Sequence, residues 1–249
     1  MNEVVFDCRW SGEVTPDFVG DFISVLECVW GENIDLDSFR SRYFHNIYGP
    51  SLMIVTYVAG YPSGTQAFWR NDIGRRLAYQ ADDGAVLEAS RGKGLLRRMI
   101  QKGMEVLGND VMLYSFPNSK SKPSFLKLGW DVISTHPVRL LMFNRFFPQQ
   151  CPQEAEYVYA KWFLRSRKHI SYVKRNGYYF LVIPTSRRYV RYIISSCDEK
   201  TAMLFEKQKG WPLLVYNKQS NTIDAEKKGN IVVMGHRGEF IPVWKCDAI

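Results

Sequence analysis

The stretch EASRGKGLL, residues 88–96, places two glycines and two cations between an apolar segment and an amphipathic one. The segment before it, residues 84–88, is mostly apolar, as the central strand of a sheet would be. In the segment after it, apolar residues share one helical face: Leu96, Met99, Ile100, Gly103 and Leu107. The pattern predicts a strand that passes through a glycine-containing turn into a helix.

A turn of this kind can bind an anion through the main chain. The first four amide N–H groups of a helix have no intrahelical partner, and the helix dipole adds partial positive charge there. The two glycines carry no side chain that would block a phosphate, and the two cations add charge. Two common phosphate motifs do not fit, because Leu87 stands where a P-loop has its first glycine and Arg97 where a dinucleotide fingerprint has its third.

The composition is that of a globular protein without metal or disulfide chemistry. Hydrophobic residues make up 46% and charged residues 23% of the 249. The five cysteines form no CxxC pair and the four histidines have no ligand spacing, so we expect no disulfide framework and no metal site. The N-terminus MNEVVFDCRW does not resemble a signal peptide, and no apolar run approaches about 20 residues. We therefore expect a cytoplasmic protein with no membrane partner.

The net charge of +8 favours an anionic partner, although charge alone does not distinguish nucleotide, phosphate, nucleic acid and membrane. A run that mixes cations with aromatics, KWFLRSRKHISYVKR (161–175), could stack on nucleic acid bases. A solvated helix face is the simpler interpretation of this run, so we do not expect a nucleic acid partner.

Other segments alternate between helix and strand patterns. Thr15-Pro16-Asp17 has the residues of a helix start, and Gly31 those of a helix end. Strands are predicted over residues 51–60, 65–73, 75–90 and 111–116, and a short helix over 124–129. Residues 130–135 and 138–144 are predicted to form a hairpin.

Two motifs together resemble the GNAT superfamily of N-acetyltransferases. RGKG (91–94), after an apolar strand and before an amphipathic helix, is similar to the family's acyl-CoA loop, although Leu96 departs from its last position. Further on, FPNS (116–119) and FLKLGW (125–130) resemble the family's second segment, where an Asn-containing loop precedes a short helix with a Lys-Leu-Gly-aromatic end. The motifs have the family's order and spacing, and the resemblance covers roughly residues 15–145.

The resemblance implies an α/β (α+β) fold, with a GNAT-type mixed and twisted sheet flanked by helices. It also implies acetyl-CoA as cosubstrate, whose pantetheine arm lies between two splayed strands and pairs with exposed backbone. Val86, Leu87 and Glu88 would line that wedge. The residues that would hold the pyrophosphate or face the cofactor are Arg91, Gly92, Lys93, Gly94, Leu95, Leu96, Asn118 and Lys122.

Acetyl transfer to an amine needs a group that removes the amine's proton. The candidate catalytic residues are Glu88, Asp82 and Asp83. Glu88 could instead form an ion pair, and the two aspartates beside Gly84 could shape a bulge or bind the substrate amine. Where many GNAT enzymes have a tyrosine that protonates the leaving thiolate, this chain has Phe125, which cannot donate a proton.

Two domains are predicted. Residues 1–147 would form a GNAT acyl-CoA-binding domain and residues 151–249 a degenerate GNAT-like C-terminal domain, because the second half echoes the order of elements without an RGKG-type loop. The Pro- and Gln-rich segment FPQQCPQ (147–153) is the predicted linker.

The sequence thus predicts an N-acyltransferase that moves an acetyl group from acetyl-CoA to a primary amine. The partner would be a small-molecule amine, for which an amino sugar is one candidate. Two alternatives stay open: a non-catalytic acyl-CoA-binding protein, and a transferase that uses an aminoacyl-tRNA donor. The sequence sets no oligomeric state, and a homodimer is one alternative.

Overall fold

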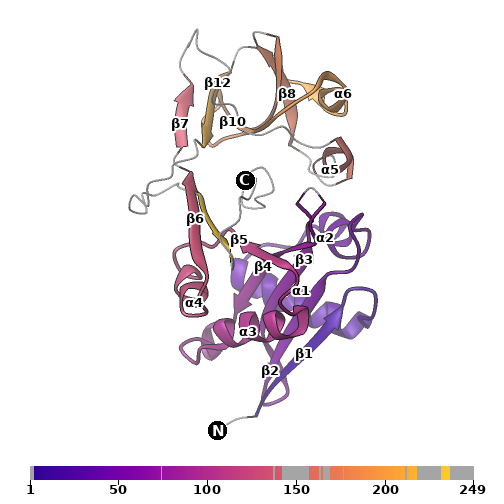
Figure 1. Cartoon of the computed structure of the whole chain (residues 1–249), viewed down its shortest axis with the longest axis vertical. Coiled ribbons are helices and arrows are strands. Elements are labelled where there is room, and N and C mark those ends of the chain that lie inside the picture. The colour runs from indigo at the N-terminus through magenta and orange to yellow at the C-terminus, as the bar shows by residue number, and fades with distance from the viewer. Residues whose placement is uncertain are drawn as a thin grey trace. The chain divides into compact units, whose positions relative to one another are not determined.

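The chain divides into two compact units, which are described separately (Figure 1). The computed structural model describes residues 3–73, 75–136, 138–141, 157–162, 164, 169–175, 177–210, 212–217 and 231–235. Unit 1 comprises Met1–Ile133 and Val233–Phe240, and unit 2 comprises Ser134–Val232 and Ile241–Ile249. The predicted linker (147–153) lies outside the described residues, so the two predicted domains stay a prediction.

Unit 1 is built on a seven-stranded sheet with the order β1-β2-β3-β4-β5-β13-β6. Its elements in chain order are β1 (Val4–Trp10), α1 (Pro16–Trp30), α2 (Leu36–Tyr43), β2 (Leu52–Val58), β3 (Tyr61–Arg70), β4 (Ala78–Val86), the 3-10 turn η1 (Glu88–Ser90), α3 (Leu95–Leu107), β5 (Met112–Ser115), α4 (Lys122–Leu126), β6 (Asp131–His136) and β13 (Ile231–Gly235). Strands β1 to β4 are antiparallel, whereas β4 and β5 are parallel. The predicted strand–turn–helix around residues 84–107 is confirmed.

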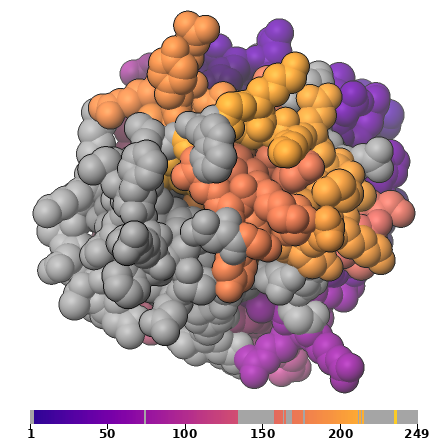
Figure 2. Space-filling model, turned by 90° about the horizontal axis from the view of Figure 1, so that it is seen from above, coloured from indigo at the N-terminus to yellow at the C-terminus, as the bar shows by residue number. Residues whose placement is uncertain are grey.

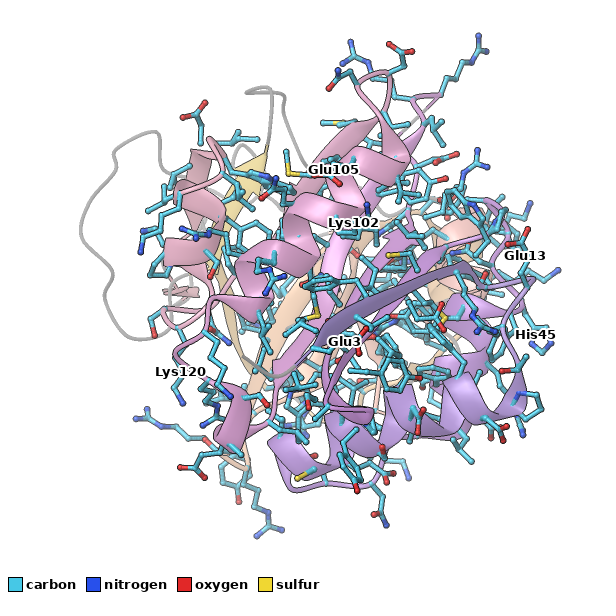
Figure 3. All side chains as sticks on the ribbon, turned by 90° about the horizontal axis from the view of Figure 1, so that it is seen from below. Glu3, Glu13, His45, Lys102, Glu105 and Lys120 are labelled. Carbon is cyan, nitrogen blue, oxygen red and sulfur yellow. The ribbon has the colours of Figure 1, made fainter. Side chains whose placement is uncertain are left out.

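Helices cover both faces of this sheet. Neighbouring residues of a strand point to opposite faces, and on β3 Phe68 lies against Gly103 of α3 while Trp69 lies under Arg42 of α2. Helix α1 shares the face of α2, because Phe22 contacts Phe39 and Tyr43 with ring centroids 6.0 and 6.1 Å apart. The outer side of α3 is polar: Figure 3 shows Lys102 and Glu105, which form an exposed ion pair at 3.2 Å.

The contact between α3 and β3 leaves no room for a side chain at Gly103. A methyl group there would lie 2.0 Å from Cε2 of Phe68, which is fully buried and cannot move aside. We expect Gly103→Ala to lower the free energy of unfolding by about 2–3 kcal/mol, measured by chemical denaturation.

Gly20 of α1 is the matched control, because a methyl group there would meet nothing within 4 Å. Gly20→Ala is expected to raise the free energy of unfolding by about 0.5–1 kcal/mol, since alanine is the better helix former. Equal stability of the two variants would show that α3 packs less closely on β3 than described.

The predicted hairpin of residues 130–135 and 138–144 is wrong. Strand β6 lies in the sheet of unit 1 beside β13, whereas β7 (Val138–Leu141) pairs with β12 (Leu213–Asn217) in a second sheet. The place that a hairpin partner of β6 would have taken is filled by β13, whose Met234 and Gly235 pair with Ser115 and Tyr114 of β5. Each sheet is therefore completed by a strand from a distant part of the chain.

Unit 2 is built on a six-stranded sheet with the order β11-β8-β9-β10-β12-β7. Its remaining elements are α5 (Tyr157–Trp162), β8 (Ser171–Arg175), β9 (Tyr178–Pro184), β10 (Val190–Cys197), α6 (Glu199–Ala202) and β11 (Glu206–Lys207). Its core includes Val173, Phe180, Val182, Ile193 and Leu214. Figure 2 shows the orange residues of this unit packed against one another from above.

The second sheet repeats the strand pattern of the first. In both sheets an antiparallel run of three strands (β2-β3-β4 and β8-β9-β10) is followed by a parallel neighbour, which in turn pairs with an antiparallel strand. The third strand of each run contains a bulge against the second, between Ile193 and Ser195 in β10. The sequence predicts a loosely similar order of elements in the two halves, and a degenerate GNAT-like second half stays a prediction.

Candidate functional site

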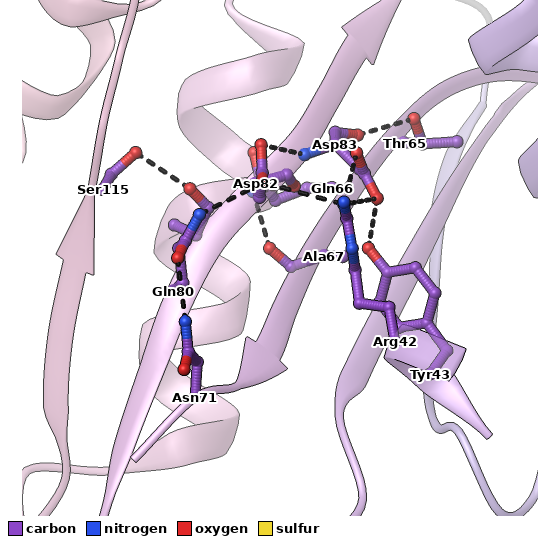
Figure 4. Close-up of polar contacts among 11 residues, drawn as sticks. Arg42, Tyr43, Thr65, Gln66, Ala67, Asn71, Gln80, Asp82, Asp83 and Ser115 are labelled. Atoms are coloured by element: carbon purple, nitrogen blue, oxygen red, sulfur yellow. Dashed lines mark hydrogen bonds and ion pairs between the residues drawn. The ribbon is translucent and has the colours of Figure 1, made fainter. Parts of the chain in front are cut away.

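Strand β4 carries a bulge at the two candidate aspartates. Ala67 of β3 pairs with Asp82 and Thr65 pairs with Ala85, so two residues of β4 lie opposite one residue of β3. Asp83 adopts a left-handed backbone with φ of 51°. In a regular strand the side chains of adjacent residues point to opposite faces, but this bulge turns both carboxylates toward α2 (Figure 4).

Asp83 is the buried member of the pair. Its carboxylate accepts hydrogen bonds from Arg42 Nη1 at 3.1 and 3.3 Å and from the Tyr43 hydroxyl, and its side chain is 7% exposed. Although burial disfavours the Arg42 charge, the neighbouring acidic groups raise the pKa of its guanidinium. Burial and the charge of Asp83 raise the pKa of Tyr43 well above its ordinary value. Asp83 is thus held by two donors from one helix.

Asp82 is more exposed than Asp83, and its carboxylate lies farther from the Arg42 guanidinium. Its side chain is 31% exposed, and its Oδ2 lies 3.7 Å from Arg42 Nη1. It accepts hydrogen bonds from the Asp83 backbone N–H (2.9 Å) and from Gln80 Nε2 (3.2 Å). Desolvation, followed by the charge of Asp83, raises the pKa of Asp82 to about 6. A carboxylate with this pKa is ionised at neutral pH and is a stronger base than an ordinary aspartate.

A chain of amides fixes the orientation of Asp82. Gln80 donates to its Oδ2, and Asn71 Nδ2 donates to Gln80 Oε1 at 3.2 Å. Both amide side chains are buried. Gln66 reaches across the bulge and donates to the main-chain carbonyls of Ala67 and Asp82, each at 2.8 Å. The bulge is therefore held from both sides of the strand.

The pairing of strand β4 with β5 ends just before the bulge. The two strands pair only over Ala78–Gln80 and Met112–Tyr114, and Ser115 Oγ then donates to the Ala81 carbonyl. Within the described part of the chain, β4 has no further partner on the β5 side up to its end at Val86. The unpaired edge of β4 beyond this point is one with which an extended ligand could form main-chain hydrogen bonds.

The free edge of β4 leads directly to the glycine turn. Leu87 N–H donates to the Ser63 carbonyl of β3, so the main-chain groups of Val86 face away from β3. The Val86 carbonyl accepts a hydrogen bond from Arg91 Nε at 3.1 Å. Arg91 thus lies against the edge where an added strand would pair.

The N-terminus of α3 fits a phosphate. Gly92 and Gly94 have φ of 77° and 69°, and no side chain caps the helix. A methyl group at Gly92 would meet nothing within 4 Å, and one at Gly94 only Arg97 Nη2 at 3.9 Å, so the space in front of the helix is open. Lys93 is exposed and reaches the Ala89 carbonyl at 3.4 Å. The backbone amides of this turn are arranged to accept an anion.

The other predicted residues have different surroundings. Asn118 Oδ1 accepts from the N–H groups of Lys120 and Ser121, each at 3.0 Å, so this oxygen shapes the loop before α4. Phe125 is buried against Trp130 with ring centroids 4.8 Å apart, which makes it a packing residue. Lys122 begins α4 and is partly exposed.

Glu88 is not part of the aspartate cluster. It lies in the exposed turn η1, and the contacts of the described residues do not join it to Asp82 or Asp83. Arg42 and Tyr43, which hold the cluster, were missed by sequence reasoning. Asp83 lies 41 residues beyond Arg42, and no local pattern connects them. The general need of a buried carboxylate for a partner indicates only that some donor must approach.

The described residues show neither a metal-binding cluster nor a membrane-spanning helix. No group of three or more His, Cys, Asp or Glu in the described ranges could hold a metal ion. Among the helices of that part of the chain, none has both the length and the apolar character needed to cross a membrane.

Solved structures of acetyltransferases share this fold. The chain is similar to a GCN5-related N-acetyltransferase from Anabaena variabilis (TM-score 0.57, 10% identity, covering 93% of this chain and 72% of that one). It is similar to another from Kribbella flavida (TM-score 0.55, 10% identity, 94% and 71%). A third is a probable N-acyltransferase from Enterococcus faecalis (TM-score 0.56, 8% identity, 94% and 72%). At the level of sequence, no family model and no curated protein matches.

The chain has the GNAT fold, and the predicted fold class is confirmed. The alignments cover at least 93% of the chain, so the likeness extends into unit 2.

Proposed function

We propose that this protein is an N-acyltransferase that moves an acetyl group from acetyl-CoA to a primary amine. One observation carries the proposal: the free edge of β4 connects an aspartate with a raised pKa to an open helix N-terminus on a continuous run of chain. A cosubstrate with a pyrophosphate at one end and a reactive thioester at the other would reach both.

In this proposal separate groups of residues bind the cosubstrate and accept the proton. The N–H groups at the start of α3 bind the pyrophosphate, and Arg91 moves off the Val86 carbonyl so that the pantetheine amides can pair with β4. Asp82 takes the proton from the attacking amine, whose nitrogen forms the new bond to the acetyl carbon as the carbon–sulfur bond breaks. Phe125 supplies no proton, and a thiol with an ordinary pKa of about 8.5 leaves readily as thiolate.

Unit 2 would take no acetyl-CoA. After β10 the chain has Asp198, whose carboxylate accepts the Thr201 N–H at 2.7 Å at the start of α6. A carboxylate in this position fills the place of an anion and repels phosphate. The bulge of β10 also carries Ile194 and Ser195 rather than acids. These features support the prediction of a degenerate second half.

The test is a thermal-shift titration followed by an assay of free thiol. We expect acetyl-CoA to raise the melting temperature, and a primary amine to release CoA thiol at a rate proportional to enzyme. Amino sugars and other small amines would be compared as acceptors. Stabilisation without amine-dependent thiol release would favour the non-catalytic acyl-CoA-binding protein.

The uneven charge supports a second candidate, a transferase that uses an aminoacyl-tRNA donor. Residues 134–249 hold 19 Lys and Arg against 9 Asp and Glu, whereas residues 1–133 hold 14 against 16. The positive charge therefore lies in the second half, as binding to a polyanion would require. RNA that competes with CoA would support this candidate, and CoA binding unaffected by RNA would count against it.

A further inference from the structure

Two adjacent carboxylates on one face of a sheet cannot both act as the base. Two neighbouring negative charges oppose each other's ionisation, so the surroundings of the two carboxylates decide which one exchanges protons. The contacts differ between the two: Arg42 bonds both oxygens of Asp83, at 3.1 and 3.3 Å, but lies 3.7 Å from Asp82.

The contacts of Tyr43 also distinguish Asp83 from Asp82. The Tyr43 hydroxyl donates to Asp83 and makes no described hydrogen bond to Asp82. Tyr43 is 1% exposed and packs on Phe39 at 4.8 Å, so its hydroxyl is fixed by the core of the α1–α2 layer. Arg42 is held over the Trp69 ring at 5.1 Å. Two rigid donors therefore hydrogen-bond Asp83, whereas from the same two residues Asp82 has only the longer ion pair with Arg42 at 3.7 Å.

No other described charge faces the pair. Strand β3 contributes neutral groups: Thr65 Oγ1 donates to the Asp83 carbonyl, and Gln66 donates to the Asp82 carbonyl. Ser115 of β5 donates to Ala81. Gln80 is a neutral neighbour on β4 itself. The charges that act on Asp82 are thus those of Asp83 and Arg42.

We propose that Arg42 and Tyr43 are positioning residues that hold the Asp83 carboxylate by hydrogen bonds, so that Asp82 is the carboxylate that exchanges a proton with the substrate. This inference rests on the proposed function, in which Asp82 accepts the proton of the amine. Asp83 acts through its charge and never touches the substrate. Arg42 and Tyr43 act through Asp83 and define which carboxylate is the base.

The proposal predicts shifts of opposite sign for two substitutions. Asp83→Asn removes the neighbouring negative charge and leaves Arg42 to pair with Asp82, so the pKa of Asp82 falls. Arg42→Gln removes the compensating cation, so the pKa of Asp82 rises. Each shift is expected to be about one unit. Arg40→Gln, an exposed arginine on the same helix, is the control and shifts nothing. A purely structural role would not produce opposite signs.

The measurement is an NMR titration of the Asp82 carboxyl carbon in the full chain without any cosubstrate, alongside the pH profile of kcat/KM. If Arg42→Gln does not fold, the double variant R42Q/D83N removes the buried pair together, and we expect the pKa of its Asp82 to lie above that in Asp83→Asn, because the Arg42 cation is gone. Shifts of the same sign, or none, overturn the proposal. Opposite shifts without detectable transfer leave the proton assignment standing and remove the proposed function. If acetyl transfer is observed but kcat/KM does not fall in acid near the pKa of Asp82, the proposed function stands and the assignment of the proton to Asp82 is wrong.

Discussion

Gly94→Asp is expected to weaken acetyl-CoA binding by about 100-fold or more, which corresponds to about 2.8 kcal/mol. The new carboxylate would take the helix amides that are open in front of α3 and would repel the pyrophosphate. At α6 the chain already has a helix capped by an aspartate, Asp198, whose backbone is extended whereas that of Gly94 is left-handed. Isothermal titration calorimetry with acetyl-CoA measures the loss.

Gly94→Asn is the matched control for this substitution. Asparagine has the shape of aspartate and tolerates the left-handed backbone of Gly94, where φ is 69°, but it carries no charge. We expect it to weaken binding by no more than about tenfold, the worth of one hydrogen bond. If the two variants bind equally, backbone strain explains the effect; if aspartate binds as well as glycine, α3 does not hold the pyrophosphate.

Asp82→Asn is expected to lower kcat/KM by about 10²- to 10⁴-fold while the Kd of acetyl-CoA is unchanged, because the amide cannot accept the proton of the amine. In the unmodified protein we expect the proposed activity to rise as the pH increases through about 6, where Asp82 becomes ionised. Asp82→Asn would lose this limb. Glu88→Gln is the control, and we expect less than about a threefold change because Glu88 is exposed and separate from the cluster.

A stability measurement separates this effect from misfolding. The pKa of Asp82 is raised on folding from 3.8 to about 6, so ionising Asp82 costs the folded state free energy. The contribution of Asp82 is most favourable in acid and declines as the pH rises toward 6. The stability of Asp82→Asn relative to the unmodified protein should therefore increase between pH 4 and pH 7 in thermal denaturation. A constant difference would contradict the raised pKa.

The parts of the fold that local patterns define were predictable. The turn at residues 91–94 and the helix after it follow from glycine, charge and periodicity within one stretch, and Thr15-Pro16 marked the start of α1 correctly. A bulge at Asp82 and Asp83 was one interpretation of the acidic pair beside Gly84, next to a catalytic base and a site for the substrate amine. The register of β3 and β4 shows the bulge, and the catalytic role stays a proposal.

Long-range pairing was not predictable from the same signals. A run of apolar residues predicts that a strand will form but not which strand it will pair with. Strands β6 and β7 were therefore predicted to pair with each other, whereas β6 pairs with β13 and β7 with β12. The same limit applies to the site. Arg42 of α2 contacts Asp83 of β4 only in the folded chain, and the sequence around either residue does not predict this contact.

The position of β13 between β5 and β6 has a consequence for folding during translation. While the ribosome is still translating residues 142–230, the sheet of unit 1 lacks β13, and β5 and β6 each present an unpaired edge. A nascent chain in that state can assemble the glycine turn at residues 91–94 and the aspartate bulge, yet its sheet still lacks one strand. Termination of the chain between residues 142 and 230 would leave β5 and β6 with unpaired edges that can pair with other chains, and such a fragment would be expected to need chaperones.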